Sequence, residues 1–155
     1  MQRWYVEPTE EREIAAIAQL EKEIFSDAWS ERAVKESWIQ NQTILLTLRE
    51  GEEKRVIGYA ILYYVLDEAE IARIAVRSET RRCGAGTYLF SEILRICKEK
   101  QITKILLDVR QSNQAAIAFY RRKGFAEDGI RKCFYEHPKE DAVLMSMETD
   151  CQIMH

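Results

Sequence analysis

Apolar residues recur along the chain with two different spacings, and the spacing predicts which segments are helices and which are strands. In segments 11–25 and 87–100 the apolar residues stand three or four positions apart, as on the buried side of an amphipathic helix. Segments 31–40 and 114–123 are also predicted to be helical, because each follows a residue that caps helices well. Shorter runs rich in β-branched and aromatic residues predict strands at 3–8, 43–48, 56–66, 70–76, 102–109, 133–135 and 142–148.

Capping and turn residues separate these segments. Thr9, Ser30 and Asn113 stand where helix N-caps are expected, and Gly124 suits the left-handed position after the last helix. Segment 70–109 has the order strand, helix, strand, which requires a parallel strand pair with a right-handed crossover. Short polar turns join the other strands, which are therefore expected to be antiparallel. The predicted fold is a mixed α/β domain, with a mostly antiparallel central sheet, one parallel strand pair and flanking helices.

Length and composition narrow the class of protein. The 155 residues are predicted to form a single domain, with a disordered tail from about residue 149. The net charge of −3 does not indicate direct binding of nucleic acid. The longest apolar run, 56–66, is too short to span a bilayer, and the N-terminus lacks the apolar stretch of a signal peptide. A cytoplasmic protein with free thiols and no metal site is expected, because no metal-like spacing or CxxC pair relates Cys83, Cys97, Cys133 and Cys151.

The stretch RRCGAGTYLF, residues 81–90, combines two cations, two glycines and the start of a helix. A helix N-terminus presents unpaired N–H groups and a partial positive charge. Gly84 and Gly86 allow a ligand to approach the backbone closely, and Arg81 and Arg82 add full positive charges. This combination suits a phosphate or pyrophosphate group. Because the helix dipole alone contributes only about 0.3–1 kcal/mol, several N–H groups and the arginines would have to act together.

Other interpretations of the two glycines stay open at this point. A P-loop is excluded, since the chain lacks GxxxxGK[ST]. The dinucleotide fingerprint GxGxxG is matched except at its third position, Leu89, and Asp108 stands near the place of its ribose-binding acid. However, seven residues separate Val76 from Gly84, whereas the dinucleotide turn follows its strand directly. A plain loop with a glycine-assisted helix start is the remaining alternative.

The pattern R-x-x-G-x-G at residues 81–86 resembles the pyrophosphate loop of the GCN5-related N-acetyltransferases, which bind acetyl-coenzyme A. In that family the loop also lies between the fourth strand and the third helix, and the predicted order of elements matches over essentially the whole chain. Within the family, the chain is similar to the ribosomal-protein-alanine N-acetyltransferases at 65–76, 107–125, 130–135 and 140–145, and more weakly at 28–31. It departs from that pattern at Ala28, Cys83 and Asp108, where proline, a basic residue and glutamate are usual.

The resemblance implies direct transfer of an acetyl group from acetyl-coenzyme A to an amine. It places the general base at Asp108, which is one methylene shorter than the family's glutamate and would act through a water. It places the general acid, which protonates the leaving thiolate, at Tyr120. The structural alternative for Asp108 is an ion pair with Arg110 or Arg131. For Tyr120 the alternative is a core aromatic, a role for which the neighbouring Phe119 is the better candidate.

The resemblance also implies two binding surfaces. Free N–H groups at the end of strand 70–76 would polarise the thioester carbonyl. The expected coenzyme contacts are Ile74, Ala75, Val76, Arg81, Arg82, Cys83, Gly84, Ala85, Gly86, Thr87 and Asn113. The expected peptide groove is lined by Trp29, Glu68 and Tyr135. The alternative roles are packing for Trp29 and Tyr135, and helix capping for Asn113.

The acceptor implied by the resemblance is a protein N-terminus, in particular the N-terminal alanine of the eighteenth small-subunit ribosomal protein. An α-amine has a reference pKa of about 7.7–8.0, against about 10.4 for lysine, so on the order of a tenth of it is neutral at pH 7. A weak base is then sufficient. The alternatives are other protein N-termini, lysine or polyamine amines, a non-catalytic acyl-coenzyme A-binding module, and a dinucleotide-dependent oxidoreductase. Binding to a membrane is not expected.

Overall fold

The computed structural model describes residues 3–81 and 83–149. Its helices are η1 (Glu11–Glu13), α1 (Ile14–Ile24), α2 (Glu31–Ile39), η2 (Ser78–Thr80), α3 (Ala85–Glu99) and α4 (Gln114–Arg122), where η marks a 3₁₀ helix. Its strands are β1 (Trp4–Pro8), β2 (Thr43–Glu50), β3 (Arg55–Val65), β4 (Glu68–Val76), β5 (Lys104–Arg110), β6 (Ala126–Glu136) and β7 (Lys139–Glu148). The predicted α/β class and the predicted order of helices and strands are confirmed.

Most of the predicted helix ends are confirmed by their hydrogen bonds. The Ser30 side chain accepts from the N–H of Ala33, and the Asn113 side chain accepts from the N–H of Ala116, both at 3.1 Å. Gly124, after α4, has φ 109°, a conformation that glycine adopts without steric cost. These N-caps could be predicted from the sequence because a capping residue and its N–H partner stand within three residues of each other.

The N-cap predicted at Thr9 is wrong. The Thr9 hydroxyl contacts the Thr47 hydroxyl of β2 at 2.8 Å instead of a helix N–H group. The helical segment starts one residue later, where the Glu13 carboxylate accepts from the N–H of Glu10 at 2.9 Å. A long-range partner on the sheet therefore replaces the local one.

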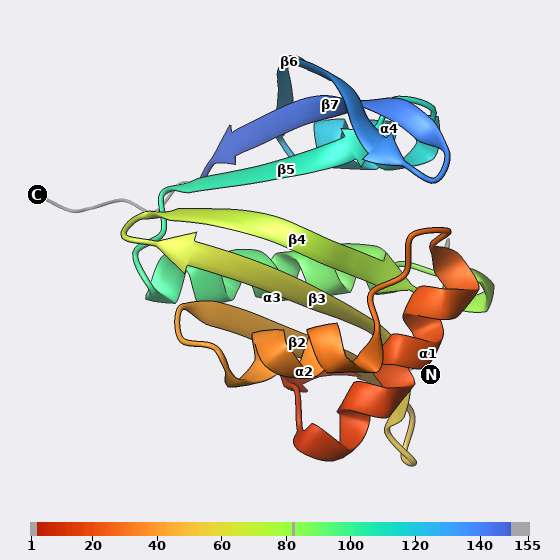
Figure 1. Cartoon of the computed structure of the whole chain (residues 1–155). Helices are drawn as coiled ribbons and strands as arrows, with labels where there is room; N and C mark the ends of the chain where they lie inside the picture. Colours follow the sequence, from red (N-terminus) through yellow and green to blue (C-terminus); the bar gives the residue numbers. More distant parts are fainter. Residues whose placement is uncertain (1–2, 82, 150–155) are drawn as a thin grey trace, which may run out of the picture.

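The strands form one sheet in the order β1-β2-β3-β4-β5-β7-β6. All neighbouring pairs are antiparallel except β4 and β5, which are parallel and are connected through α3. Helices α1 and α2 cover one face of the sheet, and α3 and α4 cover the other (Figure 1). The mixed sheet predicted from segment 70–109 is confirmed.

Strands β4 and β5 pair only over their N-terminal halves. The register ends where Ile71 faces Leu107, although β4 continues to Val76 and β5 to Arg110. Beyond that pair the two strands diverge toward their C-terminal ends (Figure 1), and we call these diverging parts the fork. Directly after Ile71, Ala72 has no partner in β3, which is a β-bulge. Because a bulge bends its strand, it accounts for the separation of β4 from β5 at this point.

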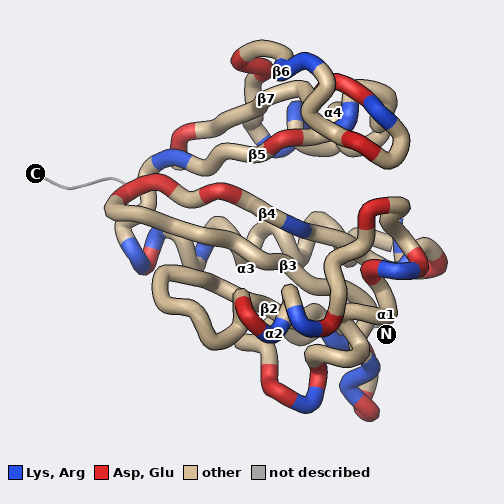
Figure 2. The backbone as a smooth tube through the Cα atoms, viewed as in Figure 1, with Lys and Arg blue, Asp and Glu red and all other residues tan. Residues whose placement is uncertain are grey.

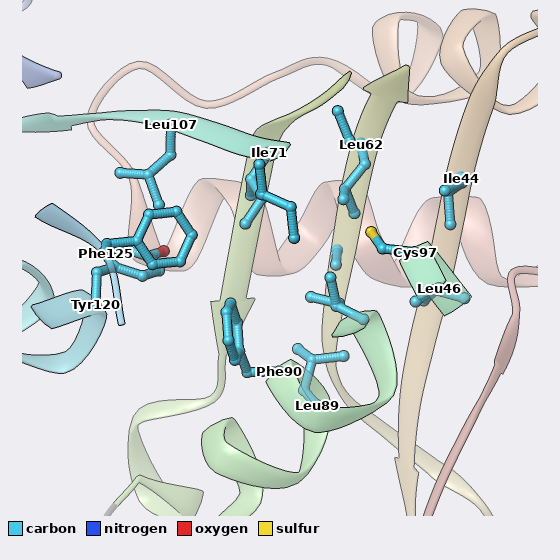
Figure 3. Packing of buried hydrophobic residues seen from close by; sticks show 14 of the residues in the cluster. Ile44, Leu46, Leu62, Ile71, Leu89, Phe90, Cys97, Leu107, Tyr120 and Phe125 are labelled. Carbon is cyan, nitrogen blue, oxygen red and sulfur yellow. The ribbon is translucent and has the colours of Figure 1, made fainter. Parts of the chain in front are cut away.

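Each face of the sheet has its own apolar core. Figure 3 shows part of the larger core, in which Leu89 and Phe90 of α3 and Tyr120 of α4 lie on the side of the sheet to which Leu107 points. A smaller core lies between α1, α2 and strands β2 to β4. The fork lies where the strands between these two cores separate.

Strand β6 is longer than predicted. It runs from Ala126 to Glu136 instead of only 133–135, and of its side chains only Tyr135 is half-buried. Its register with β7 is also interrupted twice by irregularities. An exposed edge strand with bulges lacks the alternation of apolar residues on which a strand prediction depends.

The end of the described chain is anchored. The Thr149 hydroxyl donates to the carbonyl oxygen of Ile102 at 2.8 Å. The backbone N–H of Thr149 donates to the carbonyl oxygen of Thr103 at 2.9 Å. The rest of the tail that was predicted to be disordered, residues 150–155, lies outside the described residues. Between residues 3 and 149, leaving out residue 82, no helix is long and apolar enough to cross a membrane.

Candidate active site

Part of the backbone of β4 faces the fork and not β3. Arg77 donates its N–H to β3, and successive residues of a strand direct their backbone groups to opposite sides. The N–H and C=O groups of Ile74 and Val76 therefore point away from β3, toward the side on which β5 no longer pairs with β4. The carbonyl oxygen of Val76 accepts from Arg81 Nε at 3.1 Å. Ala75, between them, faces β3 with its backbone and lies in the core beneath α1 and α2.

The predicted phosphate loop leads into an uncapped helix. Gly84 is the N-cap of α3 with φ 92°, and its position carries no side-chain cap. A Cβ atom added at Gly86 would meet Phe119 at 3.8 Å, an ordinary contact, so packing within the chain does not require a glycine there. Bare backbone at this position is instead what close approach of a ligand requires. The loop thus fits the pyrophosphate group that the sequence predicts.

A further cation, at the C-cap of α4, reaches the same loop. Lys123 Nζ donates to Thr87 Oγ1 at 3.1 Å, in the first turn of α3. The sequence analysis did not select Lys123, because it follows two arginines at a helix end and only packing brings it to α3. Among the other predicted coenzyme contacts, Arg81 and Cys83 are exposed and Ala85 is buried. Arg82 lies outside the described residues.

Helix α4 carries the remaining predicted donor-side residues. Asn113 is exposed and caps the helix, so its capping role is confirmed. The Tyr120 ring lies 5.5 Å from the ring of Phe119 and 5.4 Å from that of Phe125, and the residue is only 8% exposed. Tyr120, and not Phe119, is therefore the more buried of the two. Burial raises the pKa of Tyr120, and the nearby Tyr135 raises it further, so the hydroxyl stays protonated and able to donate.

Asp108 stands at the start of the fork on β5, on the face away from the larger core. Neither proposed ion pair forms within the described residues. Arg110 contacts Glu140 at 3.2 Å instead, and Arg131 acts on Asp108 only through its charge. Burial raises the pKa of Asp108 above its ordinary range, and Arg131 opposes the shift only in part. Within the described residues no hydrogen bond or ion pair holds the Asp108 carboxylate in its charged form, and its raised pKa makes it a better proton acceptor than an exposed aspartate.

A second carboxylate, Glu70, lies close to Asp108 and was not selected from the sequence. Glu70 faces Leu106 in the β4–β5 register, and Asp108 is two residues further along β5, so both side chains are on one face of the sheet. Desolvation raises the pKa of Glu70, the charge of Asp108 raises it further, and Arg131 opposes both effects. The predicted groove residue Glu68 shares this face, but lies at the far end of the paired segment.

Charged residues mark β4 and β5 in Figure 2, whereas most of the neighbouring β3 carries none. Central strands of a sheet with both faces covered are usually apolar. Charge on the two inner strands is therefore unusual for packing alone and marks this region as a candidate site.

The α1–α2 loop and the β6–β7 turn meet near the fork. Ser26 Oγ donates to the carbonyl oxygen of His137 at 2.6 Å. Arg110 donates to the carbonyl oxygens of His137 at 3.3 Å and Pro138 at 2.9 Å, and lies 3.8 Å from Asp27. These contacts link the two halves of the protein across the divergence of β4 and β5. The loop and the turn thus form walls beside the two carboxylates.

The other two predicted groove residues lie in these walls. The Tyr135 ring lies under the guanidinium of Arg110, 4.3 Å from it. Burial raises the pKa of Tyr135 to about 12, and Asp108 contributes to the shift. The Trp29 ring packs partly against the smaller core, 5.6 Å from the guanidinium of Arg73. Tyr135 therefore neighbours the carboxylates, whereas Trp29 has at least a packing role.

A buried ion pair holds the α1–α2 loop against β4. Glu21 of α1 is fully buried and accepts hydrogen bonds from Arg73 Nη2 at 2.6 Å, from the N–H of Trp29 at 2.8 Å and from the Tyr59 hydroxyl. Arg73 directly follows the bulge, and its guanidinium lies 4.1 Å from the centre of the Phe25 ring. One carboxylate thus connects the wall of the site to the point where β4 bends.

A family model described as the acetyltransferase (GNAT) family matches residues 14–125. The chain belongs to this family. It is an acetyl-coenzyme A-dependent acetyltransferase, and the phosphate-loop interpretation of residues 81–86 is therefore preferred over the dinucleotide one.

Three relatives show how far the similarity extends. The chain is 33% identical over 138 residues to the ribosomal protein bS18-alanine N-acetyltransferase of Salmonella typhimurium, covering 87% of this chain and 90% of that protein. It superposes with a TM-score of 0.85 on the crystal structure of the ribosomal-protein-S18-alanine N-acetyltransferase from Escherichia coli, at 27% identity, covering 95% and 94% of the two chains. Arabidopsis thaliana NAA60, solved in complex with acetyl-CoA, has the same fold at a TM-score of 0.85 and 16% identity, with coverage of 94% and 98%.

Proposed function

We propose that this enzyme transfers the acetyl group of acetyl-coenzyme A to the α-amine of a protein N-terminus. The observation that supports the proposal is the fork, where the start of α3 and the N–H groups of β4 that face away from β3 lie beside Asp108, Glu70 and Tyr120. The names of the bacterial relatives make the N-terminal alanine of ribosomal protein bS18 the first acceptor to test.

The donor side is suited to the phosphates and the thioester of acetyl-coenzyme A, which supplies an activated acetyl group when bound. The N–H groups at Gly84 and in the first turn of α3 bind phosphate oxygens, and Arg81 and Lys123 supply positive charge beside them. The N–H groups of Ile74 and Val76 stabilise negative charge on the carbonyl oxygen. Each of these groups is fixed by the backbone and so needs little rearrangement during the reaction.

The proton transfers involve one group on each side of the sheet. Asp108 accepts, through a water, the proton that the acceptor's ammonium group loses as it becomes a neutral amine. The amine nitrogen then bonds to the acetyl carbon as the carbon–sulfur bond breaks, and Tyr120 donates its proton to the departing sulfur. The second proton of the nitrogen leaves to water, water returns a proton to Tyr120, and Asp108 releases its proton to solvent. The raised pKa of Tyr120 suits an acid that must not ionise before the thiolate forms.

Competing acceptors test the proposal directly. A peptide with the N-terminal sequence of bS18 beginning with alanine, the same peptide with a blocked N-terminus and an internal lysine, and spermidine would each be incubated with enzyme and acetyl-coenzyme A. Release of coenzyme thiol and mass spectrometry report the rate and the modified position. We expect acetylation at the α-amine of the first peptide.

Modification confined to lysine or spermidine would contradict the proposal. Tight coenzyme binding in calorimetry with no turnover on any amine would instead identify a non-catalytic acyl-coenzyme A-binding module.

A further inference from the structure

We propose that Trp4 of β1 is a positioning residue for the donor side of the site. Its indole ring holds the first turn of α3 in place without using the N–H groups that the pyrophosphate of acetyl-coenzyme A requires. The inference rests on the proposed function and deepens it, because it makes coenzyme binding depend on a strand at the edge of the sheet.

Trp4 reaches both ends of this first turn. A Cβ atom added at Gly84 would lie 3.4 Å from Cη2 and 3.8 Å from Cζ3 of Trp4, so the edge of the indole borders the N-cap of α3. The rings of Trp4 and Tyr88 lie 5.8 Å apart, centre to centre, at an angle of 42°. The N–H of Tyr88 donates to the carbonyl oxygen of Gly84 at 3.0 Å. One side chain therefore spans the hydrogen bond that closes the first turn.

The indole is itself fixed on the sheet. Trp4 opens β1, where it pairs with Glu50 at the end of β2, and its Nε1 donates to the Glu50 carboxylate at 3.2 Å. Its side chain is half-buried and packs against the larger core, as does that of Tyr88. Because the ring has an apolar contact and a polar anchor, it holds the start of the helix at a set position relative to the sheet.

The start of α3 needs such a support because it lacks the usual one. The favoured N-cap residues carry a side-chain oxygen that accepts from an N–H group of the first turn. Gly84 has no such oxygen, and its backbone is left-handed. A polar cap at this position would use an N–H group that a phosphate oxygen needs. An apolar support fixes the turn and leaves those donors to the ligand.

A turn that is formed before the ligand arrives raises the affinity for the coenzyme. If only about a tenth to a fifth of the molecules formed the turn without Trp4, the apparent Kd would rise about 5- to 10-fold. Two strands separate β1 from β4 in the sheet, so Trp4 is distant from the groups that transfer protons. Its loss should therefore change binding of the coenzyme and not kcat.

Calorimetry and amide hydrogen exchange of the Trp4→Leu variant test the proposal. The Kd for coenzyme A should rise by about 5- to 10-fold. In the ligand-free variant the Tyr88 amide, followed by NMR, should exchange faster than in wild type, because its hydrogen bond to Gly84 opens more often. Saturating coenzyme A should restore most of its protection. Trp4→Phe keeps an aromatic ring and should keep most of the affinity.

Three comparisons separate positioning from general stability. Tyr5→Leu is the matched control, because Tyr5 is the next residue of β1, is also half-buried and points to the opposite face of the sheet. Its Kd for coenzyme A should equal that of wild type. Tyr88→Leu removes the second ring and should raise the Kd as Trp4→Leu does. S-acetylpantetheine carries the thioester without the pyrophosphate, so Trp4→Leu should leave the KM for this donor unchanged.

The outcomes distinguish the role of Trp4 from the proposed function. An unchanged Kd for coenzyme A in folded Trp4→Leu would refute the positioning role and leave the proposed function in place. An equal rise in KM for acetyl-coenzyme A and S-acetylpantetheine would refute it as well, since the defect would not depend on the pyrophosphate. If wild type binds coenzyme A and acetylates no N-terminus, the proposed function fails, while calorimetry and exchange still decide the role of Trp4.

Discussion

The donor side and the acceptor side of the fork are constructed in different ways. The proposed donor side is local: residues 81–87 and the first turn of α3 would supply most of its groups, and its chemistry would depend on backbone N–H groups. The acceptor side brings together side chains of α1, β4, β5 and β6, and its chemistry depends on charge. A phosphate is bound by bare backbone, which a short stretch of chain provides, whereas an amine is bound by carboxylates that distant segments must place.

The largest effect is expected where the two sides meet. Tyr120→Phe keeps the ring in the core and removes only the proton donor, so kcat should fall by about 10²–10⁴-fold with little change in melting temperature. Tyr64→Phe, which removes a hydroxyl from half-buried Tyr64 on β3, is the matched control. If Tyr120→Phe stays within about twofold of wild type when chemistry limits turnover, Tyr120 is not the acid.

Substitutions on the acceptor side should lower the free energy of unfolding more than substitutions on the donor side. Glu21→Ala leaves Arg73 as a mostly buried charge without its carboxylate, and breaking a buried pair in this way typically costs about 3–5 kcal/mol. Denaturant unfolding measures the loss of free energy of unfolding. The double variant with Arg73→Met removes both charges and should recover much of the stability. Equal stability of the single and double variants would show that packing, and not the ion pair, holds the loop.

The donor side should respond in binding and not in stability. Gly86→Leu fills the space at which a ligand approaches, and coenzyme affinity should fall by about 100-fold or more as several charge-assisted hydrogen bonds are lost. The fold should survive, since a Cβ there makes only ordinary contact with Phe119. Gly129→Leu is the control, because a Cβ at Gly129 meets nothing within 4 Å. Calorimetry that finds unchanged affinity for Gly86→Leu would refute the phosphate loop.

The smallest effect on activity is expected for Asp108→Asn, which tests whether Asp108 is the general base. About a tenth of an α-amine is already neutral at pH 7, so loss of the base in Asp108→Asn should cost about tenfold there and progressively less toward pH 9. Asp108→Glu should keep much of the activity. A defect that is constant from pH 6.5 to about 9 would contradict the base role.

The raised pKa of Asp108 has a consequence for stability as well. A carboxyl group that binds its proton more tightly in the folded state makes the fold less stable once it is ionised, above its folded pKa. Asp108→Asn should therefore not lower the melting temperature at pH 7, and thermal unfolding of the variant checks this. A clear decrease would favour a structural ion pair.

Much of the fold was predictable because its signals are local. The caps at Ser30 and Asn113 act within three residues, and the β4–α3–β5 unit follows from the alternation of strand and helix. Thr9 shows where this reasoning fails, since a partner on β2 competes with the helix for its hydroxyl. Strand β6 was recognised only at its end, because a strand exposed on both faces has no apolar period to detect.

The site divides in the same way. The sequence by itself determined the local backbone of the predicted phosphate loop, since the left-handed conformation at Gly84 and the N–H groups at the start of α3 are properties of neighbouring residues. Only the tertiary structure decided that Lys123 joins that loop and that Glu70, and not Glu68, neighbours Asp108. The alternation of a strand assigns a side chain to a face with a period of two residues, so both glutamates satisfy it equally. Their positions along the partner strand depend on register, which the packing of the whole sheet sets.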